Sequence, residues 1–258
     1  MSCPNDDESE SVASGYLICT EARTGSTFLC RALASTGVLG RPNEHFAWPR
    51  NRIAVGRDPA GGLDALIAAS ATPNGVYGLK LFSYQFDMMQ SSGWIGRLDD
   101  PCFIHLERND LLGQAISHLR AMQTDQYISN LPSAGEPRYD HRALSEVLAN
   151  LARNQARWRQ YFARNGIAPL RLVYEEVIAD PLAAVRAVAR HVGIAEPAAL
   201  DLSEIETHIQ RDALSGEWRE RFLTVARDLS YLDDWWLGRL RRGVRRARAW
   251  RERISGAD

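Results

Sequence analysis

The sequence predicts a single α/β domain built on a central parallel sheet with helices on its flanks, and two observations carry this prediction. Short apolar runs of strand length alternate along the chain with longer segments of helical periodicity, and parallel strands need crossovers of this kind to connect them. No internal repeat or low-complexity linker divides the 258 residues, so they fit one large domain with a substantial core. The hydrophobic fraction of 45% and the charged fraction of 24% are those of an ordinary globular protein.

Four apolar runs have the length and composition of buried strands, and five segments have helical patterns between and after them. The strands are predicted at Tyr16–Cys19, Val76–Leu81, Cys102–Leu106 and Leu170–Val173. The helices are predicted at Ser26–Ser35, Gly61–Ala69, Leu111–Met122, His141–Asn165 and Pro181–Val192. Right-handed crossovers would bring the loops that follow these strands to one edge of the sheet, which is where such sheets bind ligands.

The two ends of the chain differ in composition from the predicted domain, which we place at residues 15–232. Residues 1–14 are acidic and polar, which predicts a disordered arm and is the opposite of a signal peptide. Residues 233–258 are predicted to form a basic helix or tail, with either a solvated basic face or weak contact with an anionic surface. The basic side chains from Trp235 onward are Arg239, Arg241, Arg242, Arg245, Arg246, Arg248, Arg251 and Arg253.

Composition also limits the cellular compartment and the classes of partner that we expect for the protein. The formal net charge of −1 excludes a nucleic-acid binder that relies on overall positive charge. No apolar run approaches the roughly 20 residues that span a bilayer. The four cysteines form no Cys-x-x-Cys pair, so we expect reduced and mostly buried thiols. These features favour a cytoplasmic protein.

The loop after the first predicted strand has the composition of an anion-binding turn. It reads Arg23-Thr24-Gly25-Ser26-Thr27, in which Gly25 permits a tight turn and the last two residues begin a helix. Unpaired backbone N–H groups and the helix dipole favour an anion at such a place, and Arg23 adds a charge. The alternative is a capped helix start that binds nothing. The lysine of a nucleotide-triphosphate P-loop (G-x-x-x-x-G-K-[ST]) is missing.

Two further clusters lie after the third strand and near residue 215. Arg108 follows the third strand directly, and Ser117 comes nine residues later on a predicted helix. Alternatively, Arg108 forms a surface ion pair with Asp110 and Ser117 lies on an ordinary helix face. In the segment QRDALSGEWRERF, Arg211 precedes a predicted Ser215-Gly216 turn, which is followed by Trp218 and a new helix.

Together the three clusters resemble those of sulfotransferases that use 3'-phosphoadenosine 5'-phosphosulfate (PAPS). The resemblance implies a P-loop-like loop for the 5'-phosphosulfate at Arg23–Thr27, and a site for the 3'-phosphate made by Arg108 and Ser117. It also implies a segment that closes over the nucleotide, with Arg211, Ser215 and Trp218. The stretch RLVYEEVIADPLAAVRAVARHVGI is similar to a tyrosine-glutamate strand-to-helix stretch of the same family. The resemblance covers the chain from Tyr16 to about Phe222.

Within that family the chain most resembles the bacterial trehalose 2-sulfotransferase group. The shared segments are TGVLGRPNEHF, TPNGVYGLKL and QAISHLRAMQT. The first contains Glu44, which falls on the proposed catalytic base of the group, and the second contains Lys80. The chain departs from the family pattern at Glu21, which places a negative charge beside the anion loop, and at Asn109, which replaces a frequent proline.

The resemblance implies in-line sulfuryl transfer to a hydroxyl of a carbohydrate or glycosylated metabolite, with PAP as product and no metal. Glu44 is expected to be the general base. Arg23 and Lys80, which is the sole lysine among 31 basic residues, are expected to stabilise the charge that grows on the leaving group. The acceptor stays open among trehalose, other sugars, lipids and secondary metabolites. Aromatic side chains that could contact it are Phe46, Trp48, Phe82 and Tyr84. A homodimer is also possible.

Two other classes of protein stay open at this point. A kinase or nucleotide hydrolase shares the strand-loop-helix anion site, although the missing P-loop lysine disfavours it. A catalytically silent protein that binds PAP or PAPS as a sensor or scaffold would keep the three clusters without turnover. His45 and His105 could also act as bases, but His105 alternates within a strand and is expected to be a core histidine.

Overall fold

A computed structural model of the chain describes residues 15–45, 61–125, 135–197, 200–202 and 213–225. The predicted acidic arm, the basic tail and Arg211 lie outside these residues, and the domain limits of 15 and 232 stay predictions. The described strands are β1 (Gly15–Thr20), β2 (Tyr77–Phe82), β3 (Cys102–Glu107) and β4 (Leu170–Val173). They form one parallel sheet in the order β2-β1-β3-β4, which confirms the predicted fold class and all four predicted strands.

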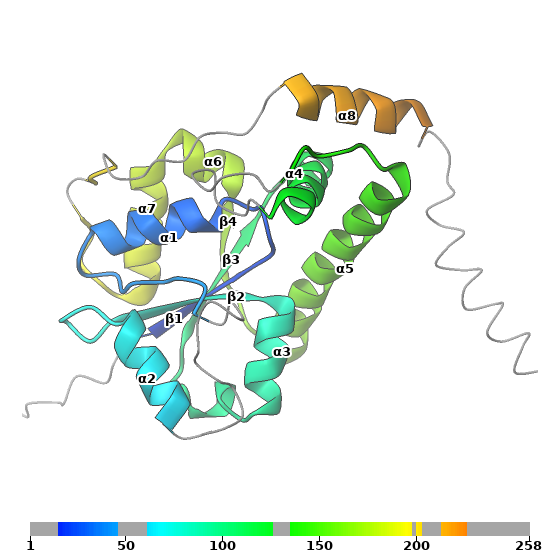
Figure 1. The fold of residues 1–258 in the computed structure, drawn as a ribbon. Helices are drawn as coiled ribbons and strands as arrows, with labels where there is room; N and C mark the ends of the chain where they lie inside the picture. Colours follow the sequence, from blue (N-terminus) through cyan, green and yellow to red (C-terminus); the bar gives the residue numbers. More distant parts are fainter. Residues whose placement is uncertain (1–14, 46–60, 126–134, 198–199, 203–212, 226–258) are drawn as a thin grey trace, which may run out of the picture.

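The described helices confirm the five predicted ones and add others (Figure 1). The predicted helices are α1 (Ser26–Ser35), α2 (Gly61–Ser70), α4 (Leu111–Thr124), α5 (His141–Asn165) and α7 (Pro181–Val192). The added ones are α3 (Ser83–Ser91) and α6 (Tyr174–Ala179), together with a 3-10 turn at Ile95–Arg97. The helix predicted after the Ser215-Gly216 turn is α8 (Ala213–Val225), which begins before that predicted turn. Helices α3 and α6 begin directly at the end of a strand, so no polar loop marks their start in the sequence.

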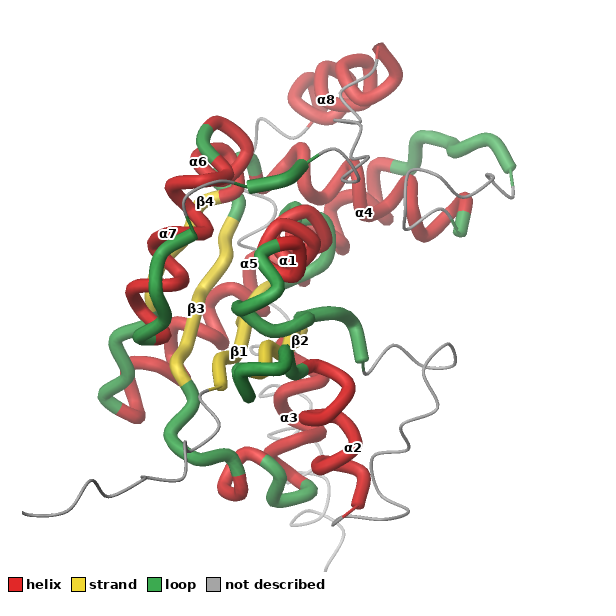
Figure 2. The backbone as a smooth tube through the Cα atoms, turned by 90° about the vertical axis from the view of Figure 1, so that its left-hand side faces the viewer, coloured by secondary structure: helices red, strands yellow, loops and turns green. Residues whose placement is uncertain are grey.

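The sheet is covered on both faces because its strands place successive side chains on opposite sides. Tyr16 and Ile18 of β1 pack with α1 and α7 on one face, whereas Leu17 and Cys19 pack with α2, α3 and α5 on the other. Figures 1 and 2 show these two helical layers on either side of the strands. Neither face of the central strand is left for ligand, so the strand ends are the available sites.

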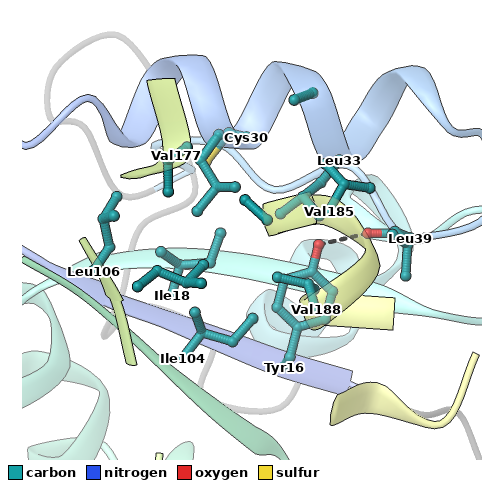
Figure 3. Packing of buried hydrophobic residues seen from close by; sticks show 14 of the residues in the cluster. Tyr16, Ile18, Cys30, Leu33, Leu39, Ile104, Leu106, Val177, Val185 and Val188 are labelled. Atoms are coloured by element: carbon teal, nitrogen blue, oxygen red, sulfur yellow. Dashed lines mark hydrogen bonds between the residues drawn. The ribbon is translucent and has the colours of Figure 1, made fainter. Parts of the chain in front are cut away.

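The core on the α1 face also anchors the chain that leaves α1 (Figure 3). Ile18 and Ile104 lie below Cys30 of α1, and Leu33 of the same helix lies beside Val185 of α7. The buried Tyr16 hydroxyl donates a hydrogen bond of 2.5 Å to the Leu39 carbonyl oxygen, and burial raises the pKa of that hydroxyl well above its usual value. This bond fixes the start of the loop that leads to residue 44.

A third cluster joins α8 to α4 and α5 and corrects one prediction. Ser215 and Gly216 were expected to form a turn, but both lie inside α8. Trp218 and Phe222, one helical turn apart, are buried against α4 and α5. Burial of two aromatic side chains outweighs the helix-breaking tendency of one glycine, which costs about 1 kcal/mol.

The structure also bears on the expectations for membrane spans, for the cysteines and for His105. Within the described ranges, no helix is long and apolar enough to cross a membrane. Cys19 and Cys30 are buried and Cys102 is half-buried, and all three are free thiols. His105 is a core histidine as predicted, because its ring is 1% exposed and packs edge-on against Phe162.

Candidate active site at the carboxyl edge of the sheet

The β1–α1 loop has the backbone shape of an anion-binding turn. Gly25 is the N-cap of α1 with φ of 75°, and no side chain caps this helix. A Cβ at Gly25 would lie 2.3 Å from the Tyr174 ring, so only glycine fits. The first amides of α1, at Ser26 and Thr27, therefore have no side-chain acceptor at the cap and can face an anion.

Threonine hydroxyls hold this loop against the neighbouring strand. The hydroxyls of Thr20 and Thr24 lie 2.6 Å apart. That of Thr24 also donates to the Glu21 carbonyl oxygen at 2.9 Å, and that of Thr20 to the Leu106 carbonyl oxygen at 3.0 Å. The Thr24 side chain, predicted to bind cofactor, thus contacts the protein, and its contribution to anion binding would come through the backbone.

Arginine side chains from three segments meet beside the loop. Arg23 Nε donates to Ser117 Oγ at 2.9 Å, and Arg108 Nη1 donates to the Arg23 carbonyl oxygen at 3.2 Å. Burial lowers the pKa of Arg23, and the positive charges of Arg108 and Arg120 lower it further. Clustered like charges of this kind favour the binding of an anion that can neutralise them. Arg23, Arg108 and Ser117, separated by up to 94 positions, thus lie together beside the loop, and their binding of a nucleotide stays a prediction.

The suggested ion pair between Arg108 and Asp110 is only a minor contact. Their closest charged atoms, Arg108 Nη2 and Asp110 Oδ2, are 3.9 Å apart. Asp110 instead accepts two hydrogen bonds from Arg219 Nη2, at 2.5 and 2.6 Å, and one from the Gly113 amide. Burial would raise the pKa of Asp110, but the Arg219 hydrogen bond and the neighbouring positive charges outweigh it and lower that pKa.

Helix α8 reaches the arginine cluster through Ser215 but not through Trp218. Ser215 Oγ accepts a hydrogen bond of 2.6 Å from Arg120 Nη1. Trp218, in contrast, is 1% exposed and packs edge-on against Tyr139. The structure therefore does not bring Trp218 to the cluster, and its predicted contact with the nucleotide finds no support in this arrangement.

Glu44 and Lys80 form an ion pair that the sequence did not reveal as a contact. Lys80 Nζ lies 2.5 Å from Glu44 Oε1, with the lysine side chain 1% exposed and the glutamate side chain 38% exposed. Lys80 pairs in register with Ile18, so its side chain lies on the α1 face, over which the loop after α1 passes. The pair presents one solvent-accessible carboxylate whose position is set by a buried ammonium.

The loop that carries Glu44 is tied to the chain that leads into β2. The Arg41 amide donates to the Ser70 carbonyl oxygen at 2.7 Å, and the Gly40 amide donates to Thr72 Oγ1 at 3.1 Å. A Cβ at Gly40 would lie 2.7 Å from the Gly78 nitrogen. Close backbone packing therefore brings the carboxylate to Lys80.

Glu21 lies beside the anion loop but its charge is directed elsewhere. Its carboxylate accepts hydrogen bonds from the Ser83 amide, Trp158 Nε1 and Asn154 Nδ2, at 3.2, 3.1 and 3.2 Å. Burial raises its pKa, although these donors oppose the rise. The carboxylate joins the β1 end to α3 and α5, so Glu21 is a buried connection between elements and not a repulsive group facing the anion.

Several residues at the site escaped the sequence analysis. Arg120 lies one helical turn after Ser117, a spacing that could have identified it. Gln114, whose Nε2 donates to the Ala22 carbonyl oxygen at 2.7 Å, precedes Ser117 by nearly one turn on the same helix. Arg219 and Tyr174 belong to segments that resemble the family, the first to the segment after Arg211 and the second to the tyrosine-glutamate stretch, but no contact was predicted for either. Within the described part of the chain, no three His, Cys, Asp or Glu side chains are grouped to hold a metal.

His45 was an alternative base. Its Nε2 lies 3.3 Å from the Arg41 carbonyl oxygen, and burial lowers its pKa. That contact ties the ring to its own loop beside Glu44. His105 does not fit the role of base because it is enclosed in the core, where burial lowers its pKa to about 4.

Comparison with known proteins agrees with this geometry. Residues 15–224 match the Stf0 sulphotransferase family. The trehalose 2-sulfotransferase of Mycobacterium tuberculosis is 26% identical over 256 residues, covering 82% of this chain and 95% of that protein. The trehalose 2-sulfotransferase of Mycolicibacterium smegmatis is 27% identical over 252 residues, covering 80% and 93%.

Among solved structures, the fold is similar to that of the sulfotransferase domain of the Synechococcus PCC 7002 olefin synthase. The TM-score is 0.50 at 12% identity, covering 85% of this chain and 92% of that domain. This likeness concerns the fold alone. The family match covers residues 15–224, which is most of the 258 residues and includes the arginine cluster and the Glu44–Lys80 pair. The chain therefore belongs to the Stf0 sulphotransferase family.

Proposed function

We propose that the protein transfers the sulfuryl group of PAPS to a hydroxyl of a carbohydrate or glycosylated metabolite. One observation carries the proposal. The Arg23–Arg108–Ser117 cluster and the Glu44–Lys80 pair lie at the same sheet edge, close enough for the Glu44 charge to act on Arg23. Cations for a bis-anionic nucleotide thus stand beside a carboxylate that can accept a proton. Both curated relatives are named trehalose 2-sulfotransferases, which favours a sugar as acceptor.

The residues present fit the proposed donor. The uncapped start of α1 and the space kept by Gly25 suit the 5' phosphosulfate, with Arg23, Ser26 and Thr27 as donors. Arg108 and Ser117, on the next strand end and helix, suit the 3'-phosphate. Ser215 contributes through its bond to Arg120. Arg211, predicted to close over the nucleotide, lies outside the described residues.

PAPS supplies an activated sulfuryl group, and the chain supplies positions, charges and a base. Glu44 takes the proton of the acceptor hydroxyl on its carboxylate as the new oxygen–sulfur bond forms, which contributes about 10²–10⁴-fold. Lys80 holds Oε1 at 2.5 Å and so orients the other carboxylate oxygen toward the acceptor. With PAPS bound, Arg23 and the loop amides would be the donors that stabilise the negative charge developing on the leaving oxygen.

Aromatic side chains beside the pair support a ring-shaped acceptor. The Lys80 ammonium lies 5.5 Å from the Phe82 ring centroid, and the Phe82 and Tyr84 rings are 6.1 Å apart. Tyr84 is 54% exposed, and its pKa is raised by burial and by the Glu44 charge. An exposed ring this close to the base can stack on the apolar face of a sugar.

Thermal denaturation with PAP, PAPS and ATP plus magnesium tests the donor. We expect stabilisation by PAP and PAPS well above that by ATP. If ATP with magnesium stabilises the protein and PAP and PAPS do not, the proposal is wrong and a kinase-like activity is favoured. A transfer assay with labelled PAPS across sugars, phenols and lipids then tests the reaction, with trehalose as the first acceptor. Tight PAP binding without transfer to any acceptor would favour a silent nucleotide-binding protein.

A further inference from the structure

We propose that Glu175 is a positioning residue that makes the site selective for a 3'-phosphorylated nucleotide. It acts by holding the loop that carries Arg108, and it touches neither donor nor acceptor. The inference rests on the proposed function, because it concerns the same nucleotide site. The property in question is the preference for PAP over a nucleotide without the 3'-phosphate, which can be measured independently of sulfuryl transfer.

The sheet brings Glu175 to this loop. Strands β3 and β4 are parallel neighbours, and Glu107 pairs in register with Val173. The chain therefore leaves both strands at the same level, and the residues after Glu107 lie beside those after Val173. Glu175 Oε2 accepts a hydrogen bond of 3.2 Å from the Asn109 amide, and its Oε1 accepts one of 3.2 Å from the Asp110 amide.

These two amides are the backbone that sets the direction of Arg108. They follow Arg108 directly and precede the first turn of α4. A carboxylate that accepts both bonds spans the loop and lies at the positive end of the helix dipole. Through these two bonds the carboxylate holds the backbone that directly follows Arg108.

The neighbouring residue Tyr174 supports the same guanidinium. The Arg108 guanidinium lies 4.8 Å from the Tyr174 ring centroid, a cation–π distance. Its Nη1 donates to the Arg23 carbonyl oxygen. Arg108 is thus supported by a ring on one element and a carbonyl on another, and this arrangement requires the loop to stay where Glu175 holds it.

The 5' side of the site is held by contacts that do not involve Glu175. The Thr20–Thr24 hydroxyls, the bond from Gln114 to Ala22 and the packing of Tyr174 on Gly25 fix the β1–α1 loop. Loss of the Glu175 carboxylate should therefore loosen Arg108. The 5' loop would lose the bond from Arg108 to the Arg23 carbonyl oxygen and is expected to stay in place through its other contacts. The consequence is a selective loss at the 3'-phosphate.

Calorimetric titration of the full chain with PAP and with adenosine 5'-monophosphate measures this selectivity. We expect Glu175→Ala to weaken PAP binding about tenfold, the effect of losing roughly one charge-assisted hydrogen bond, and to change adenosine monophosphate binding less than twofold. Glu175→Gln keeps one oxygen acceptor and should fall between. The matched control is Glu176→Ala, because Glu176 is the adjacent carboxylate of α6 and is exposed.

The outcomes separate this inference from the proposed function. If wild type binds PAP no more tightly than adenosine monophosphate, the proposed function and this inference both fail. If wild type prefers PAP and Glu175→Ala keeps the same ratio of affinities, the inference alone fails. A general structural role would weaken both nucleotides equally, and tighter PAP binding in Glu175→Ala would show simple charge repulsion. Either result overturns the inference.

Discussion

Replacing Glu44 by glutamine separates the proposed catalytic role of this residue from its structural role. Glutamine has the same shape and keeps a carbonyl oxygen that can accept from Lys80, but it cannot take up a proton at neutral pH. If Glu44 is the base, kcat for sulfuryl transfer should fall about 10²–10⁴-fold. PAP affinity should stay nearly unchanged, because the nucleotide contacts lie on other loops.

The cost in stability follows from the burial of the two partners. Removing one partner of a buried ion pair costs about 3–5 kcal/mol, but the Glu44 side chain is 38% exposed and water screens the pair. The retained hydrogen bond reduces the loss further, to about 1–2 kcal/mol. A chain of this size should then lose about 2–8 °C in Tm, which leaves it folded during the assay.

The assay is transfer from labelled PAPS to trehalose or the best acceptor found, with Tm and PAP affinity measured on the same preparations. Glu146→Gln is the matched control, because Glu146 forms an exposed helical ion pair with Arg142. That pair contributes little stability, so neither kcat nor Tm should change appreciably. Full turnover by Glu44→Gln would refute the assignment of the base, whatever the change in Tm.

Three further predictions concern the loop, the core and the acceptor side. Gly25→Ala should lower Tm and abolish PAP binding, because its φ is 75° and the new methyl meets the Tyr174 ring; Gly37→Ala has a similar φ of 69° with open space and should keep PAP binding in calorimetry. His105 is buried neutral with its pKa lowered to about 4 from an ordinary 6.5, so its contribution to stability is complete above pH 6.5 and declines as the pH falls toward 4. In denaturant titrations, His105→Phe should therefore show a smaller loss of unfolding free energy between pH 7 and 4 than wild type, and parallel curves would contradict this pKa. Tyr84→Ala should raise the KM for the acceptor about fivefold through loss of ring stacking without changing PAP affinity, and an unchanged acceptor KM in steady-state kinetics would exclude the stacking role.

Local sequence patterns determined the elements of this fold well. All four strands and five helices were predictable because burial on both faces requires continuous apolar runs and because amphipathic helices repeat every 3.6 residues. Helices α3 and α6 were missed since they start without a polar turn. The Ser215-Gly216 prediction was wrong because packing of Trp218 and Phe222 decided the conformation there.

The sequence by itself determined the parallel sheet, the anion-binding character of the β1–α1 loop and the family resemblance, since each depends on neighbouring residues or on matching segments. Only the tertiary structure decided which distant groups meet. The Lys80–Glu44 pair joins residues 36 positions apart, and the Arg23–Ser117 bond joins residues 94 apart. The tertiary structure also directs the Glu21 carboxylate into the core and brings the Glu175 carboxylate to the backbone after Arg108. Strand order and crossovers set these contacts, and neither is encoded in any one stretch of the chain.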